Sequence, residues 1–192
     1  MPYTSLIAAR TARITIATIA AALLAACSSD TPPTASPLHA SHAVGSTNEA
    51  LTSEQREGVA SVRQATAGLH IFANAQAAGY TVQYPAGCAQ SPLGVQGFHY
   101  LNPALVDGEI ELLRPELVMY EPQRDGSLQL IGVDYVVPFT AWTAEEPPTL
   151  LGVPFMRNEP LGVWALHIWA WRPNPSGMFA MWNPNASCKY AG

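Results

Sequence analysis

Lysine is almost absent from this chain of 192 residues, in which Lys189 is the only one. Nine basic residues stand against 14 acidic ones, and the formal net charge is −5. Proteins that bind nucleic acid or adhere electrostatically to anionic lipid need clusters of lysine and arginine. The composition therefore predicts no nucleic-acid partner and no membrane contact through a basic surface.

A hydrophobic run long enough to span a bilayer is also missing. The apolar segment 14–26 has 13 residues, whereas a transmembrane helix needs about 20. It follows Arg10 and Arg13 and ends in small residues, which is typical of a secretory signal.

The end of that segment, Leu24-Ala25-Ala26-Cys27, resembles the lipobox of bacterial lipoproteins. The resemblance implies that the signal peptide 1–26 is removed and that Cys27 becomes a lipidated N-terminus. Several acyl chains, palmitate among them, would anchor the protein stably, which a single chain does not do. Ser28 follows the cysteine, and this pattern resembles that of lipoproteins sorted to the outer membrane of a Gram-negative cell. We expect an exported protein whose membrane partner is reached through the lipid.

Cysteine is scarce, and only Cys88 and Cys188 remain after Cys27. In an oxidising compartment an even pair predicts a disulfide. Free thiols or metal ligands are the alternative. Neither cysteine lies in a CxxC motif, so a redox function is not indicated.

Common catalytic motifs are missing from the sequence. It has no GxSxG, no P-loop and no GxGxxG, and these are the local patterns of serine hydrolases and nucleotide-binding proteins. The absence of HExxH and of closely spaced cysteines and histidines disfavours a zinc site.

Residues 27–50 are rich in serine, threonine, alanine and proline, which predicts a solvated tether. Residues 51–192 then form a single domain of ordinary size. Thr52 and Gln55 match a capping box. Apolar and small residues recur every three or four positions until Gly79, so we expect one long helix at the N-terminal end of this domain.

Shorter, alternating apolar segments follow the helix. Strands are expected at 97–102, 117–121, 128–137 and 163–172, with a further short one at 150–156, and Asp125-Gly126 is a hairpin signal. The pattern predicts an α+β fold in which the helix packs on a mainly antiparallel meander sheet of about four to five strands, with one disulfide.

The segment 163–172 is apolar on both faces, which is typical of a strand covered on both sides. Strand alternation places His167 with Trp169 and Trp171. A core histidine that bonds through both ring nitrogens is one interpretation. A group in an aromatic-lined binding pocket is the other.

A second polar cluster lies at 97–102. His99 would meet His167 if the two strands share a sheet, and two imidazoles near a methionine would suit copper in an oxidising compartment. Met178 and Met181 are the candidate sulfur ligands. The candidate ligand-binding residues are His99, Tyr100, Asn102, His167, Trp169 and Trp171.

Acid catalysis is the other chemical option. Asp134 shares its strand face with apolar residues, so its carboxylate must find a partner or change its pKa. It is a candidate general base together with His99 or His167, and Glu116 is a second candidate. An ion pair with Arg114 or Arg172 is the structural alternative.

Five segments resemble a group of uncharacterised secreted bacterial proteins with no assigned activity. They are GFHYLNP (97–103), PELVMYEP (115–122), GVDYVVP (132–138), LHIWAW (166–171) and NPSGMFAMWNPNASC (174–188). The resemblance implies a shared fold and an exported location. It also implies glutamate at the position of Asp134 in such proteins, which keeps the acid.

Three functions remain open from the sequence. The first is a lipoprotein of the cell envelope that binds a small ligand or a metal ion in the histidine and tryptophan pocket. The second is an extracytoplasmic hydrolase that uses His99 or His167 with an acidic residue. The third is a structural envelope protein that contacts another envelope protein.

Overall fold

Residues 50–192 are described by a computed structural model of the protein. Residues 1–49, which include Cys27, the expected signal peptide and nearly all of the expected tether, lie outside the described residues. Within 50–192, no helix has both the length and the apolar character needed to cross a membrane.

The expected helix begins where the sequence predicts but does not continue to Gly79. The Thr52 and Gln55 capping box starts α1 (Ser53–Thr66), a 3₁₀ turn η1 (Ala67–His70) follows, and α2 (Phe72–Ala77) completes the segment. The Leu69 carbonyl accepts the Tyr120 hydroxyl at 2.6 Å. This tertiary bond takes the place of the intrahelical bond that a continuous helix would make there. The prediction of one long N-terminal helix is therefore wrong in its length, and α1 starts 52 residues into the chain.

The predicted packing of helix on a mainly antiparallel sheet is confirmed, but the sheet has seven strands rather than four to five. Its order is β1-β3-β4-β5-β9-β8, with β2 also paired to β3, and every pairing is antiparallel. The strands of this sheet are β1 (Val82–Gln83), β2 (Ala89–Ser91), β3 (Gly94–Leu101), β4 (Leu117–Pro122), β5 (Leu128–Pro138), β8 (Met156–Asn158) and β9 (Val163–Ile168).

The strands that the sequence missed are two or three residues long, which is too short for an alternating pattern. The expected strand at 150–156 is instead a hairpin of β6 (Thr149–Leu150) and β7 (Val153–Pro154), followed by the start of β8. Two short 3₁₀ turns, η2 (Pro103–Leu105) and η3 (Glu159–Leu161), lie in the loops.

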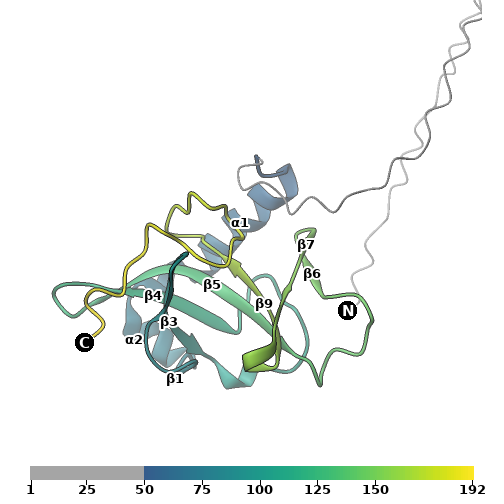
Figure 1. Cartoon of the computed structure of the whole chain (residues 1–192), viewed down its shortest axis with the longest axis horizontal. Helices are drawn as coiled ribbons and strands as arrows, with labels where there is room; N and C mark the ends of the chain where they lie inside the picture. The colour runs from purple at the N-terminus through teal and green to yellow at the C-terminus, as the bar shows by residue number, and fades with distance from the viewer. Residues whose placement is uncertain (1–49) are drawn as a thin grey trace, which may run out of the picture. The chain divides into compact units, whose positions relative to one another are not determined.

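The two faces of the sheet are covered by different parts of the chain. Val59 and Val62 of α1 belong to one buried cluster with Tyr120, Tyr135 and other side chains of the first face. On the second face, Met119 and Trp169 pack with Ala186 of the C-terminal segment. Figure 1 shows the helices behind the sheet and the yellow C-terminal segment crossing in front of it.

The predicted disulfide is confirmed. Cys88 and Cys188 are bonded, with their Cα atoms 5.9 Å apart. The bond ties the C-terminal segment to the start of β2, so it holds in place the chain that covers the second face of the sheet.

Candidate functional site

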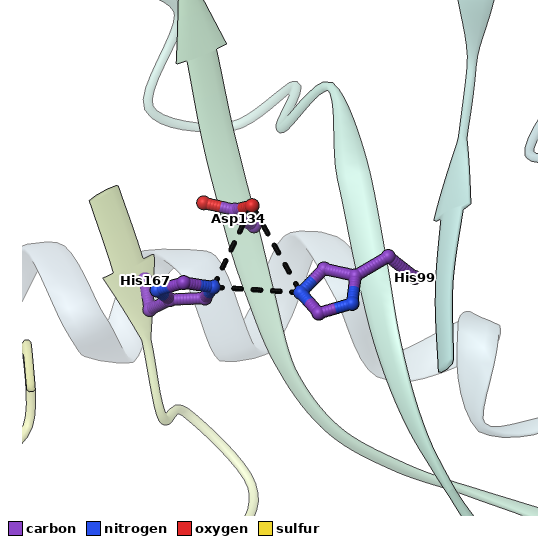
Figure 2. A group of neighbouring side chains, drawn as sticks. All are labelled: His99, Asp134 and His167. Atoms are coloured by element: carbon purple, nitrogen blue, oxygen red, sulfur yellow. Dashed lines mark hydrogen bonds and ion pairs between the residues drawn. The ribbon is translucent and has the colours of Figure 1, made fainter. Parts of the chain in front are cut away.

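Three polar side chains meet on the second face of the sheet: His99 of β3, Asp134 of β5 and His167 of β9 (Figure 2). Their exposed fractions are 2%, 5% and 4%. The Nε2 atoms of the two histidines lie 3.4 Å apart. Asp134 Oδ2 lies 3.6 Å from His167 Nε2 and 4.0 Å from His99 Nε2. One atom from each residue therefore points to a common centre.

Strand register explains this meeting. Asp134 and His167 are directly paired across β5 and β9, so their side chains leave the sheet on the same face. His99 is separated from β5 by β4, where it pairs with Met119. The register between β4 and β5 shifts between Met119 and Tyr120, and Figure 2 shows the His99 ring reaching past β4 toward the other two side chains.

Burial sets the charges in the cluster. It raises the pKa of Asp134 to about 7, and the His99 ring acts in the opposite direction. It lowers the pKa of His99 and of His167 to about 4. Both imidazoles are therefore neutral at pH 7, which is the form in which histidine ligates a metal.

The cluster is not satisfied by protein partners. Asp134 Oδ1 and His99 Nδ1 are buried and have no hydrogen-bond partner among residues 50–192. An unsatisfied buried polar group costs about 1–3 kcal/mol. The alternative in which Arg114 or Arg172 pairs with Asp134 is wrong. Those side chains pair with Glu111 and Glu121, respectively.

The spacing of the three atoms matches a metal coordination sphere. For a triangle with sides of 3.4, 3.6 and 4.0 Å, the point equidistant from the corners lies about 2.1 Å from each, which is the usual length of zinc bonds to histidine and carboxylate. In the part of the chain that the structure describes, His99, Asp134 and His167 are the one cluster of three such ligands.

The three side chains line a cavity of about 750 Å³. This volume lies in the range of small-molecule pockets. The walls are mostly apolar, and they include the exposed residues Arg157 and Glu159, which form an ion pair with each other. Apolar residues of the wall include Leu101, Leu117, Val136, Pro138, Leu161 and Ala165.

Two of the predicted pocket residues have structural roles elsewhere. Tyr100 lies on the helix face, where its ring packs 4.6 Å from Phe72 and 5.8 Å from Tyr120. The Asn102 side chain donates to the Ala78 carbonyl and accepts from Ala104 N. The assignment of both residues to the pocket is not supported, since neither lines the cavity.

Trp169 and Trp171 lie against different parts of the chain because β9 ends at Ile168. Trp169 lies beside His167, with ring centroids 6.3 Å apart, and donates from Nε1 to the Ala180 carbonyl, but it does not line the cavity. Trp171 instead donates to Thr66 Oγ1 of α1. The chain turns after β9, so alternation extended past Ile168 placed Trp171 on the wrong face.

Of the two candidate methionines and Glu116, only one methionine lines the cavity. Met181 lines the cavity, whereas Met178 packs between the two hydrophobic clusters, and its carbonyl accepts Trp169 N. Glu116 is buried, accepts the Val136 N–H at 3.1 Å and does not line the cavity. Burial raises its pKa to about 8. The structure does not bring Glu116 to the histidines.

Sequence reasoning missed the residues of β8 and η3 that close the cavity, Arg157, Glu159 and Leu161. An Asn158 side chain that accepts the Leu161 N–H, followed by Pro160 in the first turn, is a local signal for η3. Nothing in that signal tells which strand the turn lies against.

Comparisons with known proteins found no match: no protein-family model, no curated protein and no solved structure is similar to this chain.

Proposed function

We propose that this protein is an exported lipoprotein that binds a divalent transition-metal ion through His99, Asp134 and His167. One observation carries the proposal: three buried donor atoms surround a point about 2.1 Å from each of them, the distance at which zinc binds nitrogen and oxygen ligands. The unpartnered Oδ1 of Asp134 supports it further, because a cation would offset the cost of burying that carboxylate.

The expected location rests on the sequence. The lipobox-like segment ending at Cys27, the signal-like residues before it and the resemblance of the body to secreted bacterial proteins support export and a lipid anchor in the cell envelope. The Cys88–Cys188 disulfide supports an oxidising compartment. On this proposal the membrane partner is reached through the acyl chains.

The donor set favours zinc or copper(II). Imidazole suits both metals, and one carboxylate completes a set of three protein ligands. In a tetrahedral site of about 2.1 Å radius, neighbouring ligands lie about 3.4 Å apart, close to the two shorter distances measured here. Methionine ligation of copper has weaker support, since only Met181 lines the cavity.

Other functions fit the cavity less well. Among the described residues that line it, none is serine, threonine or cysteine, so a hydrolase with a hydroxyl or thiol nucleophile from one of these residues lacks its central group. A purely structural protein does not need two buried histidines open to a cavity. Metal binding uses the histidines, the carboxylate and the cavity together.

Metal content tests the proposal. The full chain is exported and purified without chelator or histidine tag, and its metals are measured by mass spectrometry. We expect near-stoichiometric zinc or copper, lost in a folded His99→Ala, His167→Ala double variant and kept in His70→Ala, an exposed histidine of η1. Equal metal content in wild type and double variant would refute the proposal.

A further inference from the structure

The three proposed ligands occupy only part of a coordination sphere. The three side chains lie on the same face of the sheet, and all three line the cavity. A metal with three protein ligands keeps an open position, which is the arrangement of catalytic and ligand-binding sites rather than of closed structural sites. The open position would face the cavity.

The charge of the site selects the donor that fills this position. A divalent ion with two neutral imidazoles and one carboxylate has a net charge of about +1. The other charged residues of the cavity wall are Arg157 and Glu159, and they pair with each other. A buried net charge is costly unless it is paired. The remaining position therefore favours a donor with a single negative charge.

The walls select the rest of the ligand. Beyond the cluster the cavity is lined by apolar side chains such as Leu117, Val136 and Ala165. These walls enclose about 750 Å³ beside the cluster, which leaves room for an apolar body next to the metal.

We propose that the site binds an organic acid whose carboxylate coordinates the metal and whose apolar body fills the cavity. This inference rests on the proposed function, because the carboxylate needs the metal. It adds the class of ligand: a monoanionic, apolar acid, in preference to a small inorganic anion or a neutral alcohol.

Cobalt(II) provides the test because its visible absorption reports on its ligands. The full chain is loaded with cobalt(II) and titrated with octanoate, with acetate and with octanol. Octanoate should change the spectrum and bind at least about tenfold more tightly than acetate, since each buried CH₂ contributes about 0.8 kcal/mol. Octanol should leave the spectrum unchanged because it brings no negative charge.

Two variants distinguish ligand binding in the cavity from metal binding by the three side chains. Ala165→Phe fills the space on the His167 face of β9, and Leu161→Asp places a negative charge in the wall at half-buried η3. Both should retain the cobalt spectrum and lose at least about ten times in octanoate affinity. Leu161→Asp keeps the test valid if Ala165→Phe does not fold.

The outcomes are distinct. Cobalt uptake with octanoate no tighter than acetate, or with an equal spectral change from octanol, overturns the inference and leaves metal binding intact. Unchanged octanoate affinity in the folded variants also overturns it. A failure of wild-type protein to bind cobalt, zinc or copper overturns the proposed function and this inference together.

Discussion

His99 Nε2 and His167 Nε2 lie 3.4 Å apart, although the residues are separated by 68 positions and their strands by β4 and β5. Four neighbouring strands span about 14 Å in a regular sheet, so both rings must lean inward over β5 to meet. Their meeting point is Asp134, which has no other charged partner in the described part of the chain.

Asp134→Asn should separate metal affinity from stability. It removes the negative ligand and preserves its shape, so zinc or copper affinity should fall at least about 100-fold, given that even outer-shell changes cost 10–100-fold. Without metal the variant should be about 1–3 kcal/mol more stable than wild type at pH 8, because a buried carboxylate with an unpartnered oxygen is removed. Titration calorimetry and urea unfolding in chelator measure the two effects. A loss of both affinity and stability would indicate a structural role for the carboxylate.

Gly97→Ala should disrupt the strand that carries His99. Gly97 has φ +82°, and an added Cβ would lie 2.3 Å from the Tyr120 carbonyl oxygen. Gly126 has φ +83° with nothing within 4 Å, so Gly126→Ala is a matched control for the backbone strain alone. Gly126→Ala should cost about 1–2 kcal/mol of unfolding free energy, and Gly97→Ala several times that, by urea denaturation. Equal costs would mean that β3 relieves the contact by moving.

Glu116→Gln should change how stability depends on pH. Burial raises the pKa of Glu116 from 4.5 to about 8, so the folded protein holds a proton that the unfolded chain releases at lower pH. The stability contribution of Glu116 is therefore present below pH 4.5 and is lost as pH rises through about 8. Glutamine removes this loss and can still accept the Val136 N–H.

The free energy of unfolding of Glu116→Gln should thus exceed that of wild type by a margin that grows from pH 5 to pH 8.5. Glu57→Gln, which removes an exposed carboxylate of α1, controls for the change in net charge and should show no such trend. A margin that stays constant with pH would contradict the assigned direction of the pKa shift.

Removal of the disulfide should destabilise the protein strongly. Cys88 and Cys188 are 100 positions apart, and closing a loop of that length stabilises by about 4–5 kcal/mol in the chain-entropy model. The Cys88→Ser, Cys188→Ser double variant should lose about this much unfolding free energy, measured in chelator so that metal binding does not contribute. A change below about 1 kcal/mol would show that the C-terminal segment is held by its packing.

Local chemistry made parts of the fold predictable. The Thr52 and Gln55 capping box is present at the start of α1, and the turn at Asp125-Gly126 joins β4 to β5, with Gly126 at positive φ. These features depend on a few neighbouring residues. At the helix break, η1 accepts a hydrogen bond from Tyr120, 51 positions away, and the periodicity of the apolar residues carries no sign of that contact.

The same contrast holds for the candidate site. Strand alternation assigned His167 and Asp134 to particular strand faces, and pairing of β5 with β9 then places them side by side. Tyr100 was assigned to the pocket because it neighbours His99, and Trp171 because the alternation of β9 was extended beyond its end. Tyr100 alternates to the helix face and Trp171 lies past the end of β9, where alternation no longer applies. Residues of η3 could not be foreseen, because their place depends on the path of a loop.

Anomalous diffraction from crystals grown with zinc tests directly whether His99, Asp134 and His167 bind a metal ion. We expect an anomalous peak at the zinc edge within about 2.2 Å of His99 Nε2, His167 Nε2 and Asp134 Oδ2, with further density at the position facing the cavity. Crystals with zinc only at surface sites such as His70, and with no anomalous peak between His99, Asp134 and His167, would contradict it.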